Sequence, residues 1–170
     1  NNSKIKLFII EIESLKREPI VFKEDPYYLP RMKFDGGKNS LIIQTINRHQ
    51  NDLKVFRYDI EKNTFQLLIR EQDKAYVNIH DDLKFLNDNS FLWTSERDGY
   101  KHIYYYDKNG NLINQVTKGN WEVSDLYSYN PDLKEIYYQS VQGSSIERGI
   151  YAIKINGKGK RILQPTNGTN

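Results

Sequence analysis

The sequence lacks cysteine, has only two alanines (Ala75 and Ala152), and contains no apolar run of about 20 residues that would span a membrane as a helix. The absence of cysteine excludes disulfides, cysteine nucleophiles and thiolate metal sites. The scarcity of alanine disfavours a helical bundle. The excess of positive charge is also small, because 25 Lys and Arg are balanced by 22 Asp and Glu, for a net charge of +3. We therefore expect no nucleic-acid partner.

The 170 residues are instead rich in aromatic side chains, with 13 tyrosines, and they repeat. Four similar segments of apolar and aromatic residues begin at Leu7, Val55, Ile103 and Ile150. The steps between these positions are 48, 48 and 47 residues, and three nearly equal steps in a row indicate a true internal repeat.

Each repeat divides into four short segments rich in Tyr, Ile, Phe and Val, which are residues that favour β-strands. Four antiparallel strands per repeat of roughly 40–50 residues are typical of a β-propeller blade. A β-sandwich is the competing all-β fold, but it does not predict the repeat. We therefore predict an all-β fold, a partial β-propeller with about three complete four-stranded blades plus a partial one. The expected blades are 26–70, 83–117 and 125–163, and the last strands of the partial blade lie within 1–25.

Two Asn-Gly pairs, Asn109-Gly110 and Asn156-Gly157, occupy equivalent places in successive repeats. Such pairs are a strong hairpin signal, and in a type I′ turn both central residues have positive φ. We therefore predict type I′ hairpins at both places.

A closed propeller has about 4–8 blades, so three and a half blades cannot form a ring. Either the chain is a piece of a longer protein, or it assembles with copies of itself. The first alternative is the more economical one.

Residue patterns for catalysis are not found. The sequence has no Gly-x-Ser-x-Gly nucleophile motif, and Gly143-Ser144-Ser145 is predicted to be a polar loop. His49, His80 and His102 show no metal-ligand spacing. We expect no catalytic residues, no metal and no cofactor.

An acidic group around the connection between two blades has two interpretations. It could bind a cation or a substrate amine, or it could be a solvated loop, which is the simpler interpretation. The acidic residues are Glu71, Asp73, Asp81 and Asp82.

The two tryptophans, Trp93 and Trp121, are both predicted to pack between blades.

Several segments resemble the propeller of dipeptidyl peptidase IV-like enzymes. Two motifs are specific, and the others support them; together they extend from about Leu29 to Leu163. The specific motifs are Phe91-Leu92-Trp93-Thr94-Ser95-Glu96-Arg97-Asp98-Gly99-Tyr100-Lys101-His102-Ile103-Tyr104 and Val116-Thr117-Lys118-Gly119-Asn120-Trp121-Glu122-Val123, and the supporting ones are Asn47-Arg48-His49-Gln50-Asn51, Tyr58-Asp59, Glu147-Arg148 and Ile150-Tyr151.

The resemblance implies that the parent protein is a serine exopeptidase that removes dipeptides, often after proline. Its propeller would cap a C-terminal α/β-hydrolase domain that carries the Ser, Asp and His, and would admit short or unstructured peptides. In the family, a pair of glutamates that holds the substrate ammonium lies upstream of the matched region. No adjacent Glu-Glu occurs here, so this role is not transferred.

Another part of the family's propeller reaches the substrate from the connection that precedes the strand at 83–86. In this chain the connection is Tyr76-Val77-Asn78-Ile79-His80, which is short. The resemblance therefore makes Tyr76 and His80 candidate substrate-binding residues, one an aromatic wall and the other a polar contact.

The resemblance also implies peptide substrates, a hydrolase domain as intramolecular partner, and a homodimer as a candidate assembly. By analogy with bacterial relatives it implies a periplasmic or cell-surface location. The alternative is a stand-alone propeller that binds partners with no enzyme attached. The two hypotheses predict complete reading frames of different length: a peptidase continues into a hydrolase domain, whereas a stand-alone propeller ends soon after its last blade.

Overall fold

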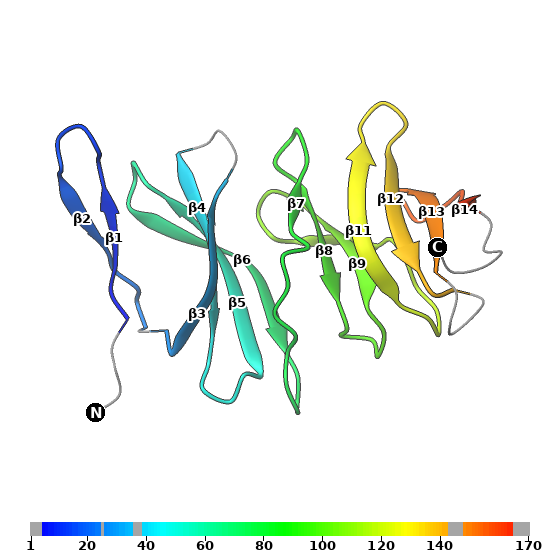
Figure 1. Cartoon of the computed structure of the whole chain (residues 1–170), viewed down its shortest axis with the longest axis horizontal. Coiled ribbons are helices and arrows are strands. Elements are labelled where there is room, and N and C mark those ends of the chain that lie inside the picture. The colour runs from blue at the N-terminus through cyan, green and yellow to red at the C-terminus, as the bar shows by residue number, and fades with distance from the viewer. Residues whose placement is uncertain (1–4, 25, 36–38, 143–147, 165–170) are drawn as a thin grey trace. The chain divides into compact units, whose positions relative to one another are not determined.

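The computed structural model describes the chain except for residues 1–4, 25, 36–38, 143–147 and 165–170. The predicted loop at Gly143-Ser144-Ser145 and the start of the partial blade lie outside the described residues. The chain divides into two compact units, Asn1–Ile79 and His80–Asn170 (Figure 1). The described ranges contain no helix with the length and apolar character that a membrane crossing requires.

Unit 1 contains a two-stranded hairpin and a four-stranded antiparallel sheet in which consecutive strands are neighbours. The hairpin strands are β1 (Leu7–Ile10) and β2 (Arg17–Ile20), and the sheet strands are β3 (Tyr28–Phe34), β4 (Ser40–Ile46), β5 (Asp52–Asp59) and β6 (Thr64–Gln72).

Strand β4 is buried at every position from Ser40 to Ile46, which fits its apolar run Leu41-Ile42-Ile43. One face of β4 packs against the hairpin: Leu41 and Ile43 form a core cluster with Ile20 and Tyr58. The hairpin therefore covers this sheet within unit 1, as one blade covers the next.

Unit 2 contains two four-stranded antiparallel sheets, ordered β10-β9-β8-β7 and β11-β12-β13-β14. The strands of the first are β7 (Lys84–Phe85), β8 (Phe91–Ser95), β9 (His102–Tyr106) and β10 (Leu112–Gln115), and those of the second are β11 (Val123–Asn130), β12 (Glu135–Ser140), β13 (Gly149–Lys154) and β14 (Arg161–Gln164).

The two sheets of unit 2 share one apolar core. Leu92 and Ile103 from the first sheet and Ile136 and Tyr138 from the second belong to a single buried cluster, with Trp121 packed against it. The predicted position of Trp121 between blades is confirmed. Trp93 is fully buried.

The predicted fold class is confirmed: the fold is all-β, with three four-stranded blades and a two-stranded partial one. The sheets follow one another along the chain, and in the described residues no strand pairs outside its own group of consecutive strands. Propeller blades have this arrangement, whereas the Greek-key connections of a β-sandwich do not.

The Asn-Gly hairpins form at both predicted places, but the predicted turn type is wrong. Gly110 and Gly157 have φ of +88° and +79°, whereas the asparagines before them are not among the residues with positive φ. The Gly110 N–H donates to the Asp107 carbonyl at 3.1 Å, and the Asp107 N–H donates to the Asn111 carbonyl at 2.9 Å. This is a type I turn followed by a left-handed glycine, which also matches the strand twist.

Candidate functional site

The connection between β6 and β7 carries both candidate residues. In unit 1 its first part lies beside the turn between β4 and β5, where the Asp73 N–H donates to the Asn51 carbonyl at 3.1 Å and the Val77 N–H donates to the Gln50 carbonyl at 2.8 Å. A meander explains this, because the turn after the second strand and the connection after the fourth lie at the same end of a sheet. The fold therefore places Tyr76 at that end.

Tyr76 is exposed over 58% of its surface. Its hydroxyl donates to Asn78 Oδ1 at 2.7 Å. The hydrogen bond to Asn78 therefore holds the ring, while more than half of its surface is open to solvent.

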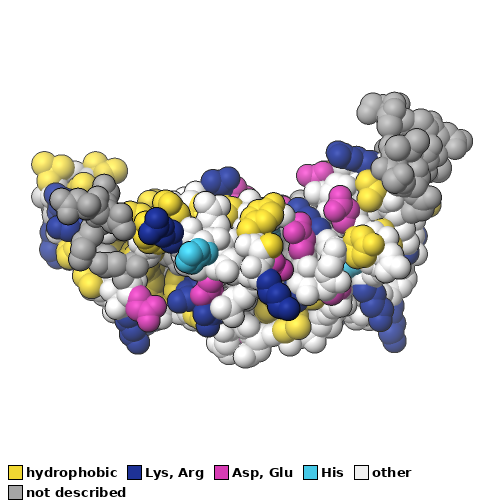
Figure 2. All heavy atoms as spheres, turned by 90° about the horizontal axis from the view of Figure 1, so that it is seen from below, with side chains coloured by type: hydrophobic (Ala, Val, Ile, Leu, Met, Phe, Trp, Pro, Cys, Tyr) yellow, Lys and Arg dark blue, Asp and Glu magenta, His cyan; other side chains and the backbone are white. Residues whose placement is uncertain are grey.

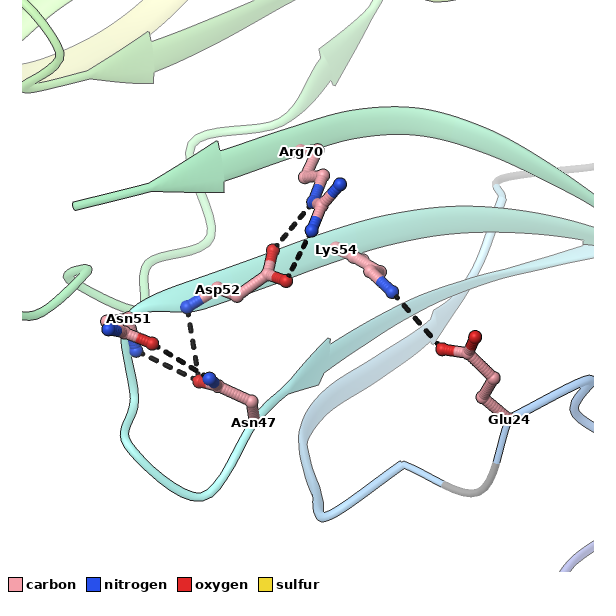
Figure 3. Close-up of polar contacts among 6 residues, drawn as sticks. All are labelled: Glu24, Asn47, Asn51, Asp52, Lys54 and Arg70. Atoms are coloured by element: carbon pink, nitrogen blue, oxygen red, sulfur yellow. Dashed lines mark hydrogen bonds and ion pairs between the residues drawn. The ribbon is translucent and has the colours of Figure 1, made fainter. Parts of the chain in front are cut away.

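The turn at 47–51 is fixed by its own side chains (Figure 3). Asn47 Oδ1 accepts from the backbone N–H groups of Asn51 and Asp52 at 3.0 and 3.1 Å, and Asn47 Nδ2 donates to Asn51 Oδ1 at 2.8 Å. At the start of β5, Arg70 donates to both carboxylate oxygens of Asp52, at 2.9 and 2.8 Å. These hydrogen bonds with Arg70 lower the pKa of Asp52.

The same turn presents Arg48 and His49, both exposed. The guanidinium carbon of Arg48 lies 5.9 Å from the ring centroid of Tyr27, within the range of a cation–π contact. Figure 2 looks at the chain from below the view of Figure 1, and basic, histidine and apolar side chains lie near one another in the part that belongs to unit 1.

The second candidate, His80, lies in unit 2 and is half-buried. Its ring packs on that of Trp93 with 4.2 Å between centroids. Its Nδ1 accepts a hydrogen bond from the Asp82 N–H at 3.3 Å. His80 is therefore oriented by a ring below it and a backbone donor beside it, and the sequence alone did not indicate either contact.

Asp82 anchors this part of the connection to the sheet. Its carboxylate accepts from Thr94 Oγ1 at 2.7 Å and forms an ion pair with Lys101 Nζ at 2.7 Å. Burial alone would raise the pKa of Asp82, but the hydrogen bonds from Lys101 and Thr94 and the charge of Lys101 outweigh it, so the pKa lies below its ordinary value of 3.8.

This lowered pKa predicts a pH-dependent role for the ion pair. Because the folded pKa of Asp82 lies below the unfolded one, its contribution to stability is present above pH 3.8 and is lost as the pH falls through the folded pKa. We expect Lys101→Met to reduce the free energy of unfolding near neutral pH, and the gap to wild type to shrink in acid. Urea denaturation at several pH values measures the gap, and a gap that stays constant into acid would contradict this role.

Asp82, one of the four acidic residues of the predicted group, is thus engaged by Lys101 and Thr94. No three His, Asp or Glu side chains in the described part of the chain lie close enough to hold a metal ion.

Arg97 makes several side-chain contacts that the sequence did not predict. Its Nη2 donates to the Tyr106 hydroxyl at 2.6 Å, its Nε donates to Ser95 Oγ at 3.0 Å, and its guanidinium lies 4.6 Å from the Tyr104 ring centroid. Burial raises the pKa of the Tyr104 hydroxyl. The available signal was the alternation of tyrosines at 104 and 106, which places both rings on one face of β9.

Unit 1 presents an exposed tyrosine ring and an exposed cation at one end of its sheet, and unit 2 separately presents the half-buried His80 ring. Such groups can hold an extended chain with apolar and polar parts, as peptide-binding surfaces do.

The comparisons with known proteins agree with the architecture. The profile of the Dipeptidyl peptidase IV (DPP IV) N-terminal region matches residues 1–170. The crystal structure of Porphyromonas gingivalis dipeptidyl peptidase 4 superposes with a TM-score of 0.86 at 30% identity over 96% of this chain and 24% of that one. A putative dipeptidyl aminopeptidase IV from Bacteroides ovatus gives a TM-score of 0.76 at 27% identity over 95% of this chain and 26% of that one.

Curated relatives show similar identity and are much longer than this chain. The probable dipeptidyl-aminopeptidase B of Pyrenophora teres f. teres is 27% identical over 98% of this chain, which covers 19% of that relative. The probable dipeptidyl peptidase 4 of Aspergillus flavus is 25% identical over 89% of this chain and 21% of its own length. The chain thus spans about a fifth of the curated relatives that it matches.

Four-stranded antiparallel sheets that follow one another along the chain define a segment of a β-propeller. The chain belongs to the dipeptidyl peptidase IV N-terminal region family.

Proposed function

We propose that this chain is a non-catalytic propeller region of a dipeptidyl peptidase IV-like serine exopeptidase, where it gates and positions peptide substrates for a hydrolase domain. Tyr76 supplies an aromatic wall and His80 a polar contact to the peptide. The single observation that carries the proposal is the family match over residues 1–170, to a region of proteins named as dipeptidyl peptidases.

The geometry of the candidate residues supports this role. The Tyr76 ring is exposed and held by Asn78, whereas His80 is oriented by Trp93 and the Asp82 backbone. Fixed side chains of this kind lower the entropic cost of binding a flexible peptide. A stand-alone binding propeller remains the alternative from sequence, and relatives named as peptidases favour the first proposal.

The proposal extends to partners and location. The intramolecular partner is a C-terminal α/β-hydrolase domain, the substrates are peptides with a free N-terminus, and a homodimer is the proposed assembly. We propose a periplasmic or cell-surface location, which fractionation of the source cells would test.

Kinetics separate gating from catalysis. We expect the purified 170-residue chain to show no turnover of a Gly-Pro chromogenic substrate above a mock preparation, and the protein of the complete reading frame to hydrolyse it. In that longer protein, Tyr76→Ala and His80→Ala should each raise the KM for a longer peptide several-fold with little change in kcat, since they would remove binding and no chemical step. Tyr127→Ala, an exposed tyrosine outside this connection, is the matched control.

Two results would contradict the proposal. One is turnover by the 170-residue chain itself. The other is a complete reading frame that has no hydrolase segment with a Gly-x-Ser-x-Gly motif, which would instead favour the stand-alone module.

A further inference from the structure

We propose that the end of unit 1 around Arg48 binds a carboxylate carried by the peptide. The site, here called the Arg48 patch, consists of Tyr27, Arg48, His49 and Tyr76. This inference rests on the proposed function, since Tyr76 belongs to both, and it adds the substrate class: peptides with a negative charge beyond the N-terminal dipeptide.

Among the described residues, no carboxylate forms an ion pair with Arg48; its one contact is with the Tyr27 ring. The acidic side chains drawn around this turn have other partners: Asp52 is bound by Arg70, and Glu24 lies 3.7 Å from Lys54 Nζ (Figure 3).

Asp73 is a further carboxylate near the turn, and it is also engaged locally. Its Oδ1 accepts from the Ala75 N–H at 2.7 Å, and its backbone N–H donates to Asn51. The cation of Arg48 is therefore directed to solvent at the end of the sheet, without a carboxylate of unit 1 held against it in the described residues.

The patch is also pre-organised. The Asn47 side chain closes the turn with two backbone hydrogen bonds, and Gln50 takes a left-handed conformation with φ of +56°. The Val77 N–H then joins the segment that carries Tyr76 to this turn. A cation on a fixed turn loses less entropy on binding than one on a mobile loop.

The chemistry of these side chains specifies the ligand. A guanidinium matches a carboxylate through two parallel hydrogen bonds, and Tyr27 restrains the guanidinium before binding. An exposed aromatic ring such as that of Tyr76 can contact the apolar parts of a peptide, including proline rings. A peptide carboxylate fits these groups, and it can come from an Asp or Glu side chain or from the C-terminus.

Four peptides distinguish the two sources. They share an N-terminal Tyr-Pro-Gly sequence and differ in carrying Glu or Gln at the fourth position and a free acid or an amide at the C-terminus. Isothermal titration calorimetry with the 170-residue chain measures their affinities at low salt. We expect at least one of the two carboxylates to strengthen binding about tenfold, and added KCl to weaken this gain.

Arg48→Met removes the charge and keeps an apolar stem on an exposed side chain. We expect this variant to bind all four peptides with the affinity of the neutral one. Lys33→Met is the matched control, because it removes an equal charge from an exposed position near the other end of β3. Circular dichroism confirms that both variants keep the fold.

The outcomes separate the two proposals. Equal binding of all four peptides to wild type would overturn the Arg48 patch and leave the peptide-contact role standing. The Arg48 patch would likewise be overturned, and the peptide-contact role would stand, if Lys33→Met lost the carboxylate preference as fully as Arg48→Met does. Failure of all four peptides to bind would overturn the patch and the peptide-contact role of this region together.

Discussion

Replacing Gly119 by alanine is expected to destabilise the chain by about 2–5 kcal/mol, the sum of backbone strain and overpacking. Gly119 has φ of +141°, in the region that side chains rarely adopt. A Cβ at this position would also lie 2.7 Å from Trp121 Cδ1 and closer still to Nε1. Trp121 cannot move away freely, because its ring packs against His102 and Tyr138.

Gly99 provides a control that separates these two causes. Its φ is +97°, but a Cβ there would meet no atom within 4 Å. Gly99→Ala should therefore show the backbone strain alone, about 1–2 kcal/mol. Urea denaturation followed by tyrosine and tryptophan fluorescence gives both values. Equal losses for the two variants would show that contact with Trp121 contributes nothing.

The strand pattern of the fold could be predicted because it depends on local residue types. The repeated segments that begin at Val55, Ile103 and Ile150 lie in the third strands of the three four-stranded sheets, β5, β9 and β13, and the Asn-Gly pairs mark hairpins as expected. The turn type could not be predicted, because Asn-Gly suits both a type I′ turn and a type I turn with a left-handed glycine. The hydrogen bonds of Asp107 with Asn111 belong to the second form.

The candidate site was predictable to a smaller extent. The resemblance indicated Tyr76 and His80, but the partners that orient them are distant in sequence: Trp93 is 13 residues from His80, and Gln50 is 27 residues from Val77. Arg48 was visible only as part of a motif. That no carboxylate of the described residues pairs with it depends on where Arg70 and Lys54 lie, and those positions follow from strand register.

His102 is the second place where we expect a large effect. It is fully buried, and its Nε2 donates to the Gly119 carbonyl at 3.0 Å. Since a carbonyl can only accept, Nε2 carries the proton and Nδ1 accepts from the Thr117 hydroxyl at 3.1 Å. The Thr117 oxygen in turn accepts from the Ile103 N–H at 2.9 Å. The motif from Thr117 to Trp121 thus closes around His102, which explains why the two specific sequence motifs occur together.

We therefore expect His102→Phe to lower the free energy of unfolding by roughly 2–6 kcal/mol, because it leaves the Gly119 carbonyl and the Thr117 hydroxyl buried without this partner, at about 1–3 kcal/mol each. His49→Phe, the same change at an exposed position, should stay within about 0.5 kcal/mol of wild type.

A double-mutant cycle tests whether the hydrogen bond between the two side chains is the cause. Thr117→Val removes the hydroxyl, so in the double variant His102→Phe/Thr117→Val neither partner of that bond is left unpaired. We expect the double variant to be more stable than the sum of the single losses predicts, by about 0.5–3 kcal/mol. Strict additivity would mean that the His102–Thr117 hydrogen bond contributes nothing, and that His102 acts through the Gly119 carbonyl and its packing on Trp121. The hydroxyl would then stabilise the chain only through the Ile103 backbone.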